Sequence, residues 1–106
     1  MLAHNVYFSM VDNSDVSKRA LVGACKLYLS QQPGIVFFAC GTLEPDLNRP
    51  VNDRDFDVAL HVVFESRAAH DAYQEAPLHL QFMSENRPNW ARVRVFDSVI
   101  EGATAG

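Results

Sequence analysis

The chain is poor in the features that mark nucleic-acid binding, secretion or membrane insertion. Only nine Lys and Arg occur among its 106 residues, and the formal net charge is -4. Because binding to phosphate backbones requires a concentrated basic surface, we expect no nucleic-acid partner. No apolar run is long enough to cross a bilayer, and the first residues lack the basic and apolar segments of a signal peptide. We therefore expect a cytoplasmic protein with no membrane partner.

Cysteine is scarce, and metal-ligand spacing is missing. The two cysteines, Cys25 and Cys40, lack CxxC spacing and each lies within an apolar segment, which favours buried free thiols over a disulfide or a metal pair. The four histidines show neither HxH nor HxxxH spacing, so we expect no metal site. The chain also lacks a glycine-rich phosphate loop and a GxSxG nucleophile motif.

One acidic stretch shows the alternation of a site for a hard cation such as calcium. Asp53, Asp55 and Asp57 run from a polar loop into an apolar segment, where alternate residues share a face. The alternative is a solvated acidic loop with Arg49 and Arg54 nearby, which we favour.

What the chain does contain is typical of one globular domain over residues 1–106. Hydrophobic residues make up 48% and charged residues 21% of the sequence, which argues against disorder. Apolar periods of two and of three to four residues predict strands over 2–11, 35–40, 56–64 and 90–99, helices over about 15–30 and 67–76, and a short helical turn within 78–87. Residues 101–106 are expected to fray.

The helix boundaries follow from local chemistry. Ser14 or Asn13 is expected to cap the first helix and Ser66 the second, and Pro77 is expected to end the second. In the last predicted strand, Trp90 is expected to share one face with Arg92 and Arg94. In the third predicted strand, Phe56 is expected to lie on the same face as Val58 and Leu60, toward the core. The predicted apolar stripe of the first helix consists of Val16, Ala20, Ala24, Leu27 and Tyr28.

The predicted order β-α-β-β-α-β is that of a ferredoxin-like α+β fold with a four-stranded antiparallel sheet. Two helices cover only one face of such a sheet. The other face carries Tyr7, Ile35 or Val36, Val63 and Phe96, which is too much apolar surface for water. We therefore expect a homodimer through the open face, the alternative being a different partner that covers it.

Several local signatures occur together along the chain. They are a histidine in the first strand (Ala3-His4-Asn5-Val6), the step Val62-Val63-Phe64-Glu65-Ser66, the pair Ala72-Tyr73, and Pro77-Leu78-His79-Leu80-Gln81-Phe82. In this respect the chain resembles the stress-responsive dimeric α/β-barrel (Dabb) family. The resemblance implies a dimeric barrel with no metal and no organic cofactor. The family usually has Pro-Ala-His where this chain has Pro77-Leu78-His79, which implies a narrower pocket.

The resemblance also implies a site. One plant member closes a linear polyketide by aldol condensation with a His and a Tyr, and these catalytic roles would fall on His79 and Tyr73. A small-molecule pocket would then include the substrate-binding residues His4, Val6, Phe8, Leu78 and Phe82. The structural alternative is that His79 caps the broken helix and that Tyr73 is a core aromatic.

Three functions follow as hypotheses. The first is a protein that binds a small hydrophobic or aromatic carbonyl compound and uses cofactor-free, cyclase- or lyase-like acid/base chemistry. The second is a non-enzymatic stress or assembly protein. The third is a cofactor-independent monooxygenase of the antibiotic-biosynthesis type, for which Asn5, Trp90 and His79 are available. Arg92 and Arg94, predicted to share a face with Trp90, would clamp an anion or bond across the dimer interface.

Overall fold

The computed structural model describes residues 1–103 of the chain, and the last three residues of the predicted tail lie outside them. Within this part the elements follow one another as β1 (Leu2–Met10), α1 (Asp15–Leu29), β2 (Ile35–Thr42), β3 (Val58–Phe64), α2 (Arg67–Glu75), α3 (Pro77–Asn86), a 3-10 turn η1 (Arg87–Asn89) and β4 (Trp90–Val99). No helix of the described part has both the length and the apolar character needed to span a membrane.

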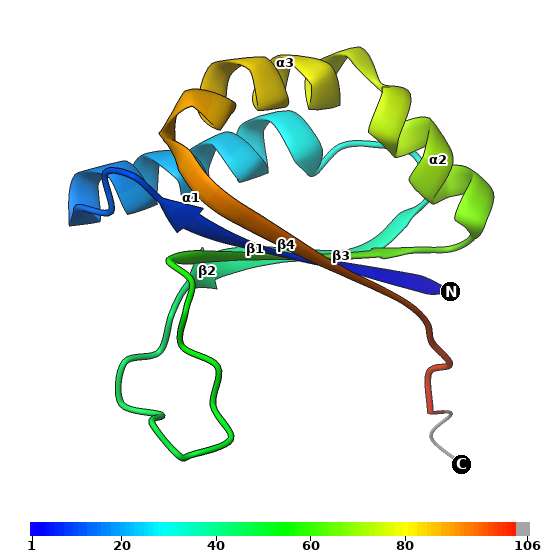
Figure 1. Cartoon of the computed structure of the whole chain (residues 1–106). Coiled ribbons are helices and arrows are strands. Elements are labelled where there is room, and N and C mark those ends of the chain that lie inside the picture. Colours follow the sequence, from blue (N-terminus) through cyan, green and yellow to red (C-terminus); the bar gives the residue numbers. More distant parts are fainter. Residues whose placement is uncertain (104–106) are drawn as a thin grey trace.

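The four strands form one antiparallel sheet in the order β2-β3-β1-β4. All three helices lie on one side of this sheet, and the other side is left open (Figure 1). The loop between β2 and β3 projects on the open side (Figure 1). This arrangement confirms the predicted ferredoxin-like α+β fold.

The core lies between the sheet and the helices. Alternate residues of the central strands are buried there, for example Val6 and Phe8 of β1 and Leu60 and Val62 of β3. Burial of such side chains contributes about 1.5–3 kcal/mol each, so this layer stabilises most of the fold. Both predicted caps are confirmed. The Ser14 hydroxyl accepts a hydrogen bond from the backbone N–H of Ser17, and the Ser66 hydroxyl accepts one from that of Ala69.

The buried stripe of α1 differs from the predicted one. Leu21, Cys25 and Leu29 face the sheet, whereas Val16 and Leu27 are 80% and 69% exposed. Two apolar series overlap in this helix at four-residue steps. Which series faces inward depends on how the helix lies across the sheet, and a helical period alone does not decide that.

A full helix replaces the predicted short turn after Pro77. Proline lacks the N–H that a first helical residue leaves unbonded, so Pro77 begins α3 as well as ending α2. Ala76 is extended, as a residue before proline tends to be, and the chain turns there. The turn places His79 and Phe82 on the inner side of α3, where both are buried.

Two aromatic residues lie on the face opposite to the predicted one. β3 begins only at Val58, and the Phe56 ring packs against Tyr7 on the open side, 4.9 Å between ring centroids. Trp90 instead packs against Phe8 on the helix side, with centroids also 4.9 Å apart. The pairing of β1 with β4 shifts register between Ser9, which pairs with Arg92, and Met10, which pairs with Trp90, so the two-residue alternation breaks between Trp90 and Arg92.

Candidate functional site

A cavity of about 140 Å³ lies between the helix side of the sheet and the helices α2 and α3. Strands β1 and β4 and helix α3 contribute most of its wall, and the wall is mainly apolar. Six of the residues predicted for a site line it: His4, Val6, Phe8, Tyr73, His79 and Phe82. The fold thus brings side chains that are up to 78 positions apart in the sequence together around one cavity.

Among the residues predicted for the small-molecule pocket, Leu78 alone does not line the cavity. Its side chain is 39% exposed, because it lies on the outer side of α3 while the next residue faces inward. The larger residue at this position therefore does not narrow the cavity, contrary to what the family pattern implied.

Two residues that line the cavity each have a buried polar atom without a hydrogen-bond partner in the described part of the chain. These atoms are Nδ1 of His79 and Nε1 of Trp90. Buried polar atoms in folded proteins are nearly always bonded, and each unmade bond costs about 1–3 kcal/mol. Nδ1 makes no cap, but a hydrogen bond with the backbone of Gln74, in the last turn of α2, acts to raise the pKa of His79, so the capping alternative for His79 stays a prediction.

The two predicted catalytic side chains are close together. The rings of Tyr73 and His79 lie 4.8 Å apart by their centroids, and the two residues are only 1% and 7% exposed. Burial lowers the pKa of His79, and the nearby His4 lowers it further. Burial also raises the pKa of the Tyr73 phenol. At neutral pH the pair therefore offers an uncharged imidazole that can take up a proton and a phenol that can donate one.

His4 has a carboxylate partner that sequence reasoning missed. Its Nδ1 lies 2.6 Å from Oδ1 of Asp97, the residue directly opposite in β4. On the other side of the ring, Nε2 lies 3.5 Å from Nε2 of Gln74. With the proton on Nδ1, donated to Asp97, Nε2 is free to accept from Gln74 or from a ligand. The only signal for this pair in the sequence was the alternation of β4, and that does not reveal the register.

The residues proposed for a monooxygenase are not brought together. His79 and Trp90 line the cavity, but Asn5 follows His4 in β1 and points to the opposite face of the sheet.

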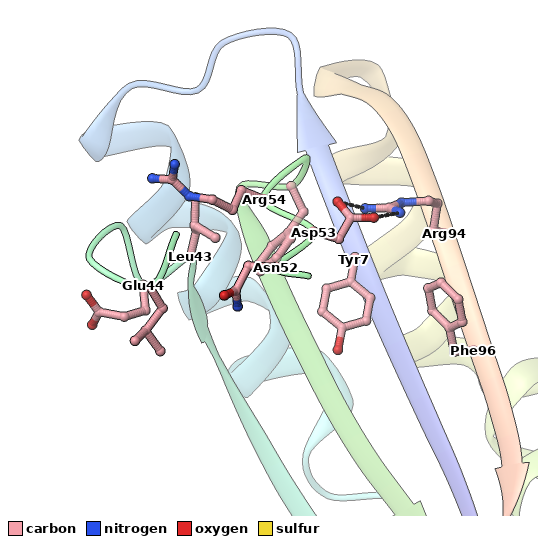
Figure 2. Close-up of a pocket in the computed structure, with 10 residues that line it drawn as sticks. Tyr7, Leu43, Glu44, Asn52, Asp53, Arg54, Arg94 and Phe96 are labelled. Atoms are coloured by element: carbon pink, nitrogen blue, oxygen red, sulfur yellow. Dashed lines mark hydrogen bonds and ion pairs between the residues drawn. The ribbon is translucent and has the colours of Figure 1, made fainter. Parts of the chain in front are cut away.

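A second hollow, of about 400 Å³, lies on the open side of the sheet beside the loop between β2 and β3. Figure 2 shows the Arg94 guanidinium making two contacts with the Asp53 carboxylate, with N–O distances of 2.7 and 3.3 Å, beside Tyr7 and Phe96. The ion pair holds the loop against β4. The hydrogen bond from Arg94 lowers the pKa of Asp53 to about 2.

The alternating acidic residues serve separate partners. Asp55 pairs with Arg92 at 3.1 Å, and Asp57 accepts a hydrogen bond from the backbone N–H of Met10 at 2.7 Å. The stretch is therefore an acidic, solvated loop, which is the alternative that the sequence favoured over a cation site. The ion-pair partners of Asp53 and Asp55 are Arg94 and Arg92 of β4, and not Arg49 and Arg54 of the loop. Arg92 and Arg94 bond within their own chain.

The family follows from residues 2–100, which match the pattern described as Stress responsive A/B Barrel Domain (Dabb). The chain belongs to this family. A comparison with curated proteins finds no match.

Solved structures similar to this Dabb protein share its fold at low identity. A Dabb protein with a ferredoxin-like fold from Mesorhizobium loti is 21% identical, with a TM-score of 0.77 over 95% of this chain and 97% of the other. A dimeric ferredoxin-like protein of unknown function from Thermobifida fusca is 18% identical, with a TM-score of 0.77 over 93% and 90%. Hydroxynitrile lyase from Passiflora edulis is 21% identical, with a TM-score of 0.75 over 98% and 96%.

Proposed function

We propose that this Dabb protein binds a small hydrophobic or aromatic carbonyl compound in the cavity beneath α2 and α3, and that it performs lyase-like acid/base chemistry without a cofactor. The observation that carries the proposal is the pair of buried, unpartnered polar atoms, His79 Nδ1 and Trp90 Nε1, on two residues that line a mainly apolar cavity.

The chemistry of these atoms indicates the kind of ligand. An indole N–H only donates, so a ligand that satisfies Trp90 must offer an acceptor such as a carbonyl or hydroxyl oxygen. The remaining wall, with Val6, Phe8 and Phe82, favours an apolar body for the same ligand. A compact aldehyde or ketone meets both conditions.

The volume favours a lyase over a polyketide cyclase. An engineered cavity of about 150 Å³ in another protein binds benzene, so about 140 Å³ suits a ligand of similar size. A compact ligand of this size fits the space more closely than a linear polyketide does. The hydroxynitrile lyase from Passiflora edulis, which has the same fold at 21% identity, supports the choice of the lyase class for this proposal.

The proposed step needs one base and one acid. Neutral His79 removes the hydroxyl proton of a substrate with an adjacent electron-withdrawing group. The carbon–carbon bond then breaks, its electron pair leaves with that group, and a carbonyl remains. His79 returns the proton to the leaving group. Tyr73 donates a hydrogen bond to the oxygen on which charge develops, and Asp97 holds His4 in place beside it.

The binding test compares two ligands that differ in one acceptor. By NMR titration, benzaldehyde is expected to bind the wild type more tightly than toluene does. Trp90→Phe is expected to weaken benzaldehyde binding about tenfold, the worth of one hydrogen bond, and to leave toluene binding nearly unchanged. Asp15→Asn, in the exposed first turn of α1 and away from the cavity, is the control. Equal losses for the two ligands would contradict the proposed role of Trp90.

The catalytic test follows the release of benzaldehyde from mandelonitrile by absorbance. His79→Asn is expected to abolish turnover and to leave the melting temperature close to that of the wild type. Turnover that survives this substitution would exclude His79 as the base.

We further propose that the protein forms a homodimer through the open face of the sheet. Val36, Phe37 and Phe96 are each more than half exposed, and the similar Thermobifida protein is described as dimeric. Light scattering is expected to give the mass of a dimer for the wild type and for Val16→Asp, which changes an exposed residue on the helix side. Phe96→Asp is expected to give a monomer. A monomeric wild type at micromolar concentration would refute the proposal.

A further inference from the structure

We infer that His4, His70 and Asp97 form a binding site for one transition-metal dication of the zinc type. One ligand atom from each residue, a ring nitrogen or a carboxylate oxygen, lies within 4.8 Å of the other two. The residues come from β1, α2 and β4, so only the folded chain brings them together.

The strand pairing and the helix position create the cluster. His4 and Asp97 are directly opposite each other in β1 and β4, and their side chains already touch at 2.6 Å. The His70 ring approaches the His4 ring edge to face, with centroids 5.1 Å apart. Both imidazoles also pack against Phe64, which makes one side of the cluster dry.

His70 is held in the way that metal-binding histidines usually are. Its Nδ1 lies 2.9 Å from Oδ1 of Asp71, and the Arg67 guanidinium bonds the same oxygen at 2.9 Å. Donation from Nδ1 to a carboxylate leaves the lone pair of Nε2 free for a metal and fixes the ring orientation. Arg67 also neutralises Asp71, so the carboxylate left to balance a cation is Asp97.

The donor set indicates the class of metal. Two imidazoles with one carboxylate suit zinc and similar dications, whereas calcium and magnesium prefer oxygen ligands alone. Bonds of about 2.0–2.2 Å in a tetrahedral site place the ligand atoms about 3.3–3.5 Å apart, so the cluster must adjust by roughly 1 Å. Asp97 can adjust because its side chain is 46% exposed, and that exposure also gives the ion an entry path.

The fourth position would remain for water or for a small anion. The sequence predicted no metal because positions 4, 70 and 97 show no ligand spacing. The metal site consists of residues other than the proposed base His79. Binding of the ion would replace the hydrogen bond between His4 and Asp97, so the ion would take over from Asp97 in holding His4, and it would contact neither His79 nor Trp90.

The test uses the untagged full-length chain, freed of metal by a chelator and titrated with Zn²⁺ against a chromophoric competitor. The wild type is expected to bind one equivalent. His70→Asn and Asp97→Asn are each expected to weaken binding at least about tenfold, and Asp71→Asn to weaken it about 10–100-fold. Asp15→Asn, in the exposed first turn of α1, is expected to bind as the wild type does.

A Co²⁺ titration gives a readout that does not depend on affinity alone. Visible absorption typical of a four-coordinate site is expected for the wild type and is expected to disappear in His70→Asn, while circular dichroism shows both proteins folded. Lack of saturable binding by the wild type would overturn the inference. An equal loss of affinity in the ligand variants and in Asp15→Asn would also overturn it.

Discussion

Replacing Gly34 with alanine should destabilise the fold at the place that sets the position of α2. Gly34 links α1 to β2 and has a φ of +86°, a left-handed conformation that costs a residue with a Cβ about 1–2 kcal/mol. Its carbonyl accepts a hydrogen bond from the backbone N–H of Glu65 at 2.8 Å, just before α2 begins. A Cβ added at this position would collide with the Cβ of Ala69, which is part of α2.

The collision adds a second cost. Overpacking of this kind costs about 1–3 kcal/mol, so the loss for Gly34→Ala should total about 2–5 kcal/mol. A domain of this size has a free energy of unfolding of about 5–15 kcal/mol. The expected fall in melting temperature is roughly 10–30 °C. Because α2 carries Tyr73, a shift of this helix would also change the cavity.

The assay is urea unfolding followed by circular dichroism, with Gly23→Ala as the matched control. Gly23 lies in α1 with no heavy atom within 4 Å of an added Cβ, so alanine there should stabilise by about 0.5–1 kcal/mol. The two substitutions should therefore act in opposite directions. In the double variant Gly34→Ala with Ala69→Gly, removal of the clash should recover part of the loss. The reasoning is refuted if Gly34→Ala unfolds like the wild type, or if the two changes at 34 and 69 are simply additive.

Three further predictions concern a cap, a titration and a loop. Ser66→Ala removes the hydroxyl that accepts a hydrogen bond from the N–H of Ala69 and should lower the free energy of unfolding in urea by about 1 kcal/mol. An unchanged urea midpoint would show that the cap contributes nothing. Because burial lowers the pKa of His79 in the folded state, the unfolded chain protonates first as the pH falls below about 6.5. The wild type should therefore lose stability from neutral to mildly acidic pH, and His79→Asn should lose less; parallel pH profiles would contradict this. Since Arg94 lowers the pKa of Asp53 to about 2, the ion pair between them should persist in mild acid. Asp53→Asn removes this ion pair and should make the loop between β2 and β3 more sensitive to limited proteolysis than it is in the wild type. Equal cleavage of the two proteins would exclude the ion pair as the restraint.

The features that sequence patterns predicted well depend on near neighbours. The caps at Ser14 and Ser66 each join residues three positions apart, so the local sequence contains both partners. The alternation of β1 and β3 also shows which side chains share a face. Together with the order of elements, these patterns were enough to predict the ferredoxin-like fold and an apolar open face.

The features that were missed depend on contacts between distant segments. Burial of Leu21 and Cys25 in place of Val16 reflects how α1 lies on the sheet. Trp90 reached the cavity because of a register shift opposite Ser9 and Met10, which no period within β4 reveals.

The candidate site shows the same division. The sequence by itself determined that His4 belongs to a strand and that Tyr73 and His79 lie six positions apart, on either side of the break at Pro77. Only the tertiary structure decided that Asp97 lies opposite His4 and that His70 approaches both. The physical reason is that hydrogen bonds along a helix or at a cap link residues a few positions apart. Strand register and helix placement are decided instead by how the whole core packs.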